Sequence, residues 1–292
     1  HCCELPNHDL FFYDLAVDEY SLVAQDLLHM NTPETARDRG NEKPRENSLK
    51  KALFITHDTG IYGAAKSLEL LLTNYREVSV DLIVQRQLAG QNDLDAIKRR
   101  FGSRIANVWE WDLPFDPCYF GRRTHLIFAL LYKIYDLFFW RPGKKRLFAL
   151  IRRGGYDFIH LNSLVLNPVL TPEFPFILHV REIYNGSHGA TVPSLRHAKG
   201  LIFIDKAMRK PFESAPLPPY VILNNPFDMT SVREYSTYRP AVPDIDVGTH
   251  TIFSMIGVVS EQKGSVFVIK SFLQMDAPDA RLLIVGGTEA AH

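Results

Sequence analysis

The feature that most restricts the fold is a regular alternation of short apolar runs with helical segments, starting at residue 51. Residues 51–56 (KALFIT) form an apolar run bounded by turn formers, as expected of a strand buried on both faces. Residues 64–75 follow with leucines at helical spacing. This alternation predicts an α/β fold with a parallel sheet covered by helices on both faces. The further strand-like runs are 78–84, 105–109, 156–161, 176–180, 200–204 and 220–223.

A polar stretch at 228–250 separates this pattern from a second, shorter one. There the rhythm restarts with a strand at 251–256, a helix at 266–275 and a strand at 281–285. A strand–helix–strand cannot bury both faces of its sheet, so we expect this unit to be incomplete and the chain to be a fragment cut at both ends.

A length of 292 residues fits about two domains. We expect an N-terminal extension and linker over 1–50, including one helix at 10–28, followed by a complete Rossmann-like domain over 51–232. An interdomain linker is expected over 233–250 and the first βαβ of a second Rossmann-like domain over 251–292.

Composition argues against several classes of protein. The 33 Lys and Arg residues balance 33 Asp and Glu, which disfavours nucleic acid as a partner because phosphate neutralisation needs a basic excess. Cys2, Cys3 and Cys118 cannot build a disulfide framework, and no C-x-x-C pair is present for zinc. No secretory signal opens the chain, and no apolar run reaches the roughly 20 residues of a membrane span. A reducing, cytoplasmic location is therefore expected.

One stretch departs from neutrality, since residues 98–153 contain 13 Lys or Arg against 4 Asp or Glu. Within it, the apolar and aromatic residues 125–140 predict a helix. Either this helix packs on the sheet with its basic ends in water, or it lies in a membrane interface. In the second case the cations that would meet anionic headgroups are Arg122, Arg123, Lys144, Lys145 and Arg146.

The loop after the first strand suggests an anion site. Residues 60–67 (GIYGAAKS) nearly match the phosphate loop G-x-x-x-x-G-K-[ST], but an alanine stands where that motif has glycine before Lys66. A Cβ there hinders the backbone nest that points N–H groups at phosphates. With Asp205 as a magnesium-holding carboxylate, a P-loop nucleotide hydrolase is an alternative function. Otherwise Gly63 and Ala64 let a helix N-terminus approach an anion, or they form a tight turn without a ligand.

A second loop of interest follows the strand at 251–256. Gly257 removes a side chain that would block a ligand, Lys263 offers a positive charge to a diphosphate, and Gly264 opens the next helix. Lys-Gly after a strand is common, and a solvated lysine is the simpler interpretation. The dinucleotide fingerprint G-x-G-x-x-G is absent, so nicotinamide or flavin binding is not expected.

Seven segments in this order resemble the retaining GT-B glycosyltransferases of family 4, over about 235 residues. They are 63–71 (GAAKSLELL), 156–163 (YDFIHLNS), 177–182 (ILHVRE), 198–205 (AKGLIFID), 221–228 (VILNNPFD), 256–264 (IGVVSEQKG) and 280–286 (ARLLIVG).

The resemblance implies a GT-B fold and transfer of a sugar from a nucleotide-sugar donor to a glycan or lipid-linked acceptor, with retention and without a metal or other cofactor. Such an activity belongs to polysaccharide or cell-envelope glycan synthesis. It implies catalytic roles for Lys263, Arg181 and Glu182. Lys263 would neutralise the leaving diphosphate, and Arg181 and Glu182 would lie on the acceptor strand. The implied donor-binding residues are Gly257, Lys263, Gly264, Gly63 and Ala64, and the implied acceptor-side residues are His160, Asn162 and Asn225.

The chain also departs from the family pattern. Val258 stands where many members have Arg, and Arg181-Glu182 where many have His-Asp. Arg181 either pairs with Glu182 or meets an acidic acceptor, and His160 and His179 are expected to be packed or hydrogen-bonded rather than bases. The family's Glu-x7-Glu segment lies beyond His292, so this fragment is expected to be inactive alone. A non-catalytic binding module is a further alternative.

Overall fold

The computed structural model describes residues 50–57, 59, 63–74, 78–86, 93–102, 105–114, 133–182, 184, 191–226, 233–234, 248–257, 259–261 and 263–287. The chain divides into two compact units, His1–Met229 and Thr230–His292, and each is described by itself. The helix predicted at 10–28 and the first part of the one predicted at 125–140 lie outside the described residues.

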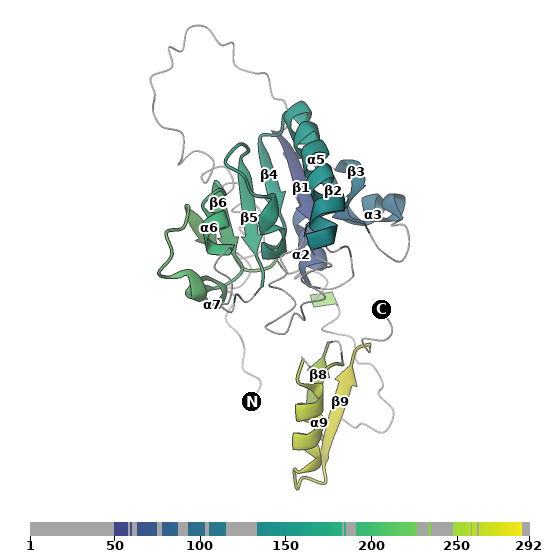
Figure 1. Ribbon diagram of the computed structural model, residues 1–292. Coiled ribbons are helices and arrows are strands. Elements are labelled where there is room, and N and C mark those ends of the chain that lie inside the picture. Colours follow the sequence, from purple (N-terminus) through teal and green to yellow (C-terminus); the bar gives the residue numbers. More distant parts are fainter. Residues whose placement is uncertain are drawn as a thin grey trace. The chain divides into compact units, whose positions relative to one another are not determined.

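Seven parallel strands form the sheet of the first unit (Figure 1), in the order β3-β2-β1-β4-β5-β6-β7. Each apolar run predicted in this unit is a strand, so the predicted parallel α/β architecture is confirmed. The strands are β1 (Lys50–Thr56), β2 (Val78–Gln85), β3 (Ile105–Trp111), β4 (Phe158–Leu161), β5 (Phe176–Val180), β6 (Gly200–Phe203) and β7 (Tyr220–Ile222).

The strand order reverses between β1 and β4. The chain builds the sheet outward from β1 to β3 on one side, then returns to place β4 against the other side of β1. In open α/β sheets the connections on either side of such a point cover opposite faces, which leaves a crevice at the carboxyl ends of the strands where ligands bind. Side chains that follow β1, β4 and their neighbours are therefore the ones to consider for function.

Helices cover both faces of the sheet, as predicted. Alternate residues of β1 explain the arrangement: Leu53 and Ile55 belong to one apolar core with Leu147 and Ile151 of α5 (Arg141–Gly154). Their neighbours in β1 belong to a second core with α2 (Gly63–Asn74) and α3 (Leu94–Phe101). Shorter helical segments are η3 (Asp136–Trp140), η4 (Leu164–Val169), α6 (Thr191–Leu195), α7 (Lys206–Arg209) and η5 (Lys210–Phe212).

The described part of the aromatic stretch is helical but only partly packed. Residues 133–135 lead into η3, which is a π-helix, and α5 continues from it. Trp140 is buried at 4% exposure, whereas Phe138 is 64% exposed. Ile134, Leu137 and Phe139 are exposed as well. No helix among the described residues is long and apolar enough to cross a membrane.

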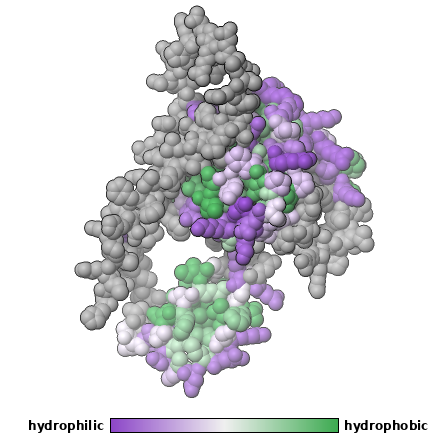
Figure 2. Space-filling model, turned by 90° about the vertical axis from the view of Figure 1, so that its left-hand side faces the viewer, coloured by the Kyte–Doolittle hydropathy of each residue, from purple (hydrophilic) through white to green (hydrophobic). Residues whose placement is uncertain are grey.

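The second unit is a two-stranded parallel sheet with one helix, formed by β8 (Thr251–Ile256), α9 (Ser265–Leu273) and β9 (Ala280–Val285). Figure 2 shows hydrophobic side chains gathered on the surface of this unit. Ile256, Phe267 and Leu273 are among its exposed large residues. The three elements thus leave apolar surface exposed among the described residues of this unit.

Candidate functional site

Polar side chains from four segments meet at the carboxyl edge of the seven-stranded sheet. Asn162 follows β4, Arg181 follows β5, Asn225 follows β7, and Ser67 lies in the first turns of α2. Together with His179 at the end of β5, they form what we call the Arg181 cluster. Parallel strands bring their carboxyl ends to one edge, so residues up to 158 positions apart in the chain become neighbours.

The guanidinium of Arg181 is the centre of this cluster. Its Nε donates to Oδ1 of Asn162 at 3.0 Å, and its Nη1 donates to Oδ1 of Asn225 at 2.6 Å. Nη2 lies 3.2 Å from Nδ1 of His179. The hydroxyl of Ser67 donates to the same Asn225 oxygen at 3.0 Å. The cation is thus held at the carboxyl edge of the sheet by neutral oxygen and nitrogen acceptors.

Two buried histidines lie behind Arg181. His160 stacks on Phe54 with ring centroids 4.7 Å apart, and it meets His179 edge-on at 5.5 Å. Burial, reinforced by the positive charge of Arg181, lowers the pKa of His160 to about 3, although a hydrogen bond with Asn162 acts in the opposite direction. Burial, Arg181 and His160 likewise hold the pKa of His179 well below its ordinary value. Both rings are therefore neutral near pH 7, and protonation is strongly opposed.

Two of the predicted acceptor-side residues are inaccessible to solvent. His160 and Asn162 are both fully buried. Because a fully buried side chain cannot touch a ligand without moving, their influence on one has to pass through Arg181. Asn225, the third predicted residue, is exposed.

Glu182 does not bring its carboxylate to the side chain of Arg181. It accepts hydrogen bonds from the hydroxyl of Ser163, from the backbone N–H of Leu164 at 2.9 Å and from the N–H of Arg181 at 3.2 Å. Of the two alternatives predicted for Arg181, a side-chain ion pair with Glu182 is therefore not formed. The two residues have separate roles. Glu182 joins the end of β5 to the start of η4, and Arg181 turns toward the two asparagines.

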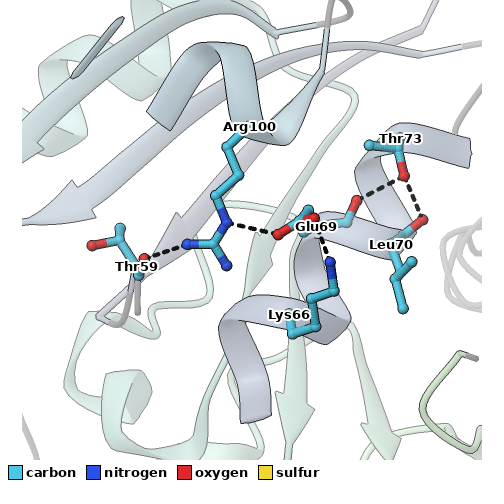
Figure 3. Close-up of polar contacts among 6 residues, drawn as sticks. All are labelled: Thr59, Lys66, Glu69, Leu70, Thr73 and Arg100. Carbon is cyan, nitrogen blue, oxygen red and sulfur yellow. Dashed lines mark hydrogen bonds and ion pairs between the residues drawn. The ribbon is translucent and has the colours of Figure 1, made fainter. Parts of the chain in front are cut away.

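Lys66 and Asp205, the two residues of the P-loop alternative, each have a partner close by in the chain. Lys66 pairs with Glu69 at 2.7 Å, one helical turn along α2, and Arg100 of α3 reaches both Glu69 and the carbonyl of Thr59, as Figure 3 shows. Burial alone raises the pKa of the Glu69 carboxyl, but hydrogen bonds from Lys66 and Arg100 outweigh it, so the pKa is lowered.

Asp205 caps α7, where its carboxylate accepts from the N–H of Met208 at 2.8 Å. It follows β6. Lys66 and Asp205 thus each have a local structural role, one on the surface of α2 and the other at the start of α7.

Gly63 begins α2 with a positive φ of 52°, and a Cβ built on it would meet nothing within 4 Å. The residue is exposed and Ala64 is half-buried. The backbone at this turn is therefore open on one side, as an approaching ligand requires.

In the second unit, Gly257 follows β8 and Gly264 precedes α9, and both have positive φ. The side chain of Lys263 is exposed. The backbone N–H of Lys263 donates to the hydroxyl of Ser260, and Ser265 accepts from the N–H of Ser260, so the turn before α9 is closed by its own hydrogen bonds.

Gly286 is a residue to which the sequence assigned no role. A Cβ on Gly286 would lie 1.8 Å from the carbonyl oxygen of Gly257, and its φ is 156°. The ends of β8 and β9 therefore approach each other more closely than any other residue type permits. The sequence signal is the Gly-Gly pair directly after the strand, which parallels the glycine after β8.

We expect Gly286→Ala to destabilise the second unit, by roughly 1–3 kcal/mol, because the new methyl group overlaps backbone rather than a movable side chain. Hydrogen exchange of the amides in β8 and β9 measures this directly. Gly155→Ala is the matched control, since it has a positive φ of 61° with open space around its Cβ. Equal protection of β8 and β9 in the two variants would contradict the steric account.

Among the described residues, no group of three or more His, Cys, Asp or Glu side chains lies close enough together to hold a metal ion.

The first unit is thus a Rossmann-like α/β domain with a polar cluster at the edge of the sheet where this class of fold binds ligands. No family profile matches the chain, and no curated protein matches it. Among solved structures, the N-terminal domain of trehalose-6-phosphate phosphatase from Candida albicans is 12% identical, with a TM-score of 0.53 over 85% of this chain and 67% of that one. At this identity, the likeness shows a shared fold and nothing further.

Two other solved structures have lower TM-scores. The lipopolysaccharide outer core galactosyltransferase WaaB in its apo form is 10% identical, with a TM-score of 0.48 over 82% of this chain and 61% of that one. UGT2 of Phytolacca americana, complexed with UDP-2-fluoro-glucose and pterostilbene, is 10% identical, with a TM-score of 0.42 over 80% and 71% of the two chains.

Proposed function

We propose that this chain belongs to a glycosyltransferase of GT-B type that moves a sugar from a nucleotide-sugar donor to a glycan or lipid-linked acceptor, with retention and without a metal. The observation that carries the proposal is the Arg181 cluster at the carboxyl edge of a Rossmann-like sheet. Arg181 follows β5, which corresponds to the acceptor-side strand of the glycosyltransferases that the sequence resembles. The order of the seven sequence segments supports it. A cytoplasmic location stays a prediction from the sequence.

The proposed roles follow the chemistry of each group. Lys263 neutralises the diphosphate as it leaves, and a fixed cation is most effective where charge develops in the transition state. Gly257 and Gly264 let the backbone near that lysine approach the donor. Arg181 meets an anionic group of the acceptor, and Gly63 and Ala64 form the turn that faces the ligand in the first unit.

Calorimetry with UDP-glucose, ADP-glucose and GDP-mannose, each without magnesium, tests this function. We expect one of these donors to bind and the corresponding nucleoside diphosphate to compete with it. Binding of magnesium–ATP alone, lost in Lys66→Ala, would replace the proposal with the P-loop alternative. Absence of binding to any nucleotide would leave a non-catalytic binding module.

We also propose that the exposed apolar side chains of residues 134–139 contact an anionic membrane surface. Lys145 and Arg146 follow on the same helix, and their side chains are exposed. Lys144, also predicted to meet headgroups, is instead half-buried and donates to the carbonyl of Pro168 at 3.3 Å. Apolar rings beside cations favour the interface of a bilayer with anionic lipids. Arg122 and Arg123 lie outside the described residues.

Flotation with vesicles of phosphatidylcholine, with and without phosphatidylserine, measures this contact. We expect binding to the anionic vesicles alone, with at least about tenfold loss in a Phe138→Ser, Phe139→Ser variant. Phe267→Ser is the matched control, because Phe267 is an exposed aromatic residue of the second unit. Equal binding to both vesicles, or to neither, would argue against electrostatic docking.

A further inference from the structure

The side-chain amide of Asn162 joins three separate segments of the first unit. Its Oδ1 accepts from Nε of Arg181 at 3.0 Å, beyond the end of β5. Its Nδ2 donates to the backbone carbonyl of Ala64 at 3.3 Å, in the first turn of α2, and lies 3.4 Å from the hydroxyl oxygen of Thr56 at the end of β1. One planar group therefore ties the turn at the start of α2 to the guanidinium of Arg181.

Only an amide meets these demands at this position. The guanidinium of Arg181 carries donors alone, so it needs an acceptor, whereas the carbonyl of Ala64 needs a donor. Aspartate would keep the hydrogen bond with Nε of Arg181. Its second carboxylate oxygen, however, would face the carbonyl oxygen of Ala64, and two acceptors repel each other. Alanine would lose both contacts, and because Asn162 is fully buried, water does not replace them.

Asn225 provides a second connection between the same two parts. Its Oδ1 accepts both from Nη1 of Arg181 at 2.6 Å and from the hydroxyl of Ser67 at 3.0 Å. Ser67 lies one turn along α2 from Ala64. The helix and the guanidinium are thus joined twice, through Ala64 and Asn162 and through Ser67 and Asn225.

We propose that Asn162 and Asn225 are positioning residues, which hold the Arg181 guanidinium at a fixed place against the first turns of α2. This inference rests on the proposed function, in which Arg181 and the turn at Gly63 and Ala64 face the ligands. Asn162 acts without touching a ligand. It joins the turn at Gly63 and Ala64 to Arg181 as one rigid group, so a displacement of the turn also displaces the Arg181 guanidinium.

The NMR signal of the Arg181 Nε–H group, assigned by its loss in Arg181→Lys, tests the positioning directly. We expect its exchange with water to become about tenfold faster in Asn162→Ala, which corresponds to losing one buried hydrogen bond. Asn162→Asp restores the acceptor and is expected to restore slow exchange. Asn167→Ala is the matched control, because Asn167 is also a buried asparagine but bonds to Ser194 instead.

Unchanged exchange in Asn162→Ala would overturn the proposal. If that variant does not fold, Asn225→Ala decides by the same measurement, since Asn225 is exposed and its loss leaves no buried gap. Faster exchange of the Arg181 signal in Asn225→Ala supports the proposal, and an unchanged rate overturns it.

Affinity for UDP-glucose supplies the functional measurement. We expect roughly three- to tenfold weaker binding in both Asn162→Ala and Asn162→Asp, because each frees the carbonyl of Ala64, and no change in Asn167→Ala. Wild-type affinity in Asn162→Ala, despite fast exchange, would overturn the coupling between the turn and Arg181. If the wild-type chain binds no nucleotide sugar, the proposed function fails, and the exchange rates still decide the positioning.

Discussion

Replacing Lys263 with alanine is expected to reduce sugar transfer by about 10²–10³-fold, the usual cost of removing a group that stabilises developing charge in the transition state. In the part of the chain that the structure describes, its side chain is exposed and has no hydrogen bond or ion pair, so it can turn toward a ligand at little cost. The turn that holds its backbone is closed by Ser260 and Ser265 and does not depend on the lysine side chain.

The measurement is the rate of sugar transfer from the donor identified by calorimetry, made with the full-length protein. Lys270→Ala is the matched control, because Lys270 is an exposed lysine of α9 two turns further along the helix. Lys66→Ala should reduce the rate by no more than about twofold, since Lys66 is paired with Glu69 on the surface of α2. A large loss in Lys66→Ala with little change in Lys263→Ala would reverse the assignment of the two lysines.

The sheet could be predicted closely from the sequence because its strands are buried on both faces. A run such as Leu53-Phe54-Ile55 is apolar throughout, since alternate side chains enter the cores on opposite faces. Sequence periodicity could not show where the helix after residue 133 packs. Almost every residue from Ile134 to Trp140 is apolar, so the sequence does not show that Trp140 is buried while Phe138 and Phe139 are exposed.

The sequence indicated which polar residues belong to the site, but not which residues each of them bonds to. The motif around His179, Arg181 and Glu182 marked the end of β5 as polar, and that edge does carry the Arg181 cluster. The choice of partner depends on neighbouring strands. Glu182 meets Ser163 and Leu164 because η4 starts beside it, and Arg181 meets asparagines that lie 19 and 44 residues away in the chain. The closeness of Gly257 and Gly286 is likewise a property of two paired strands.

Acidification is expected to destabilise the first unit steeply, because it contains two histidines that are neutral when folded. In the unfolded chain a histidine takes up a proton near pH 6.5. In the folded unit the pKa of His160 is about 3 and that of His179 lies well below its ordinary value. Below pH 6.5 the unfolded chain therefore binds protons that the folded unit does not bind, so stability falls as the pH falls.

His160 costs about 1.4 kcal/mol per pH unit below 6.5 while it stays neutral in the fold, or about 2 kcal/mol by pH 5. His179 adds to this loss in the same direction. For His160 the loss continues down to its folded pKa of about 3. Urea unfolding at pH 7, 6 and 5, followed by circular dichroism, measures the slope.

His179→Asn separates this effect from general acid sensitivity. The amide oxygen of the new asparagine is able to accept from Nη2 of Arg181, as Nδ1 of His179 does, but it takes up no proton. We expect the slope to be smaller in this variant than in the wild-type protein, because one of the two buried histidines no longer contributes to it. If the dependence of stability on pH were unchanged in His179→Asn, His179 would already be protonated in the folded unit. A neutral His179 that accepts from Nη2 of Arg181 would then be contradicted.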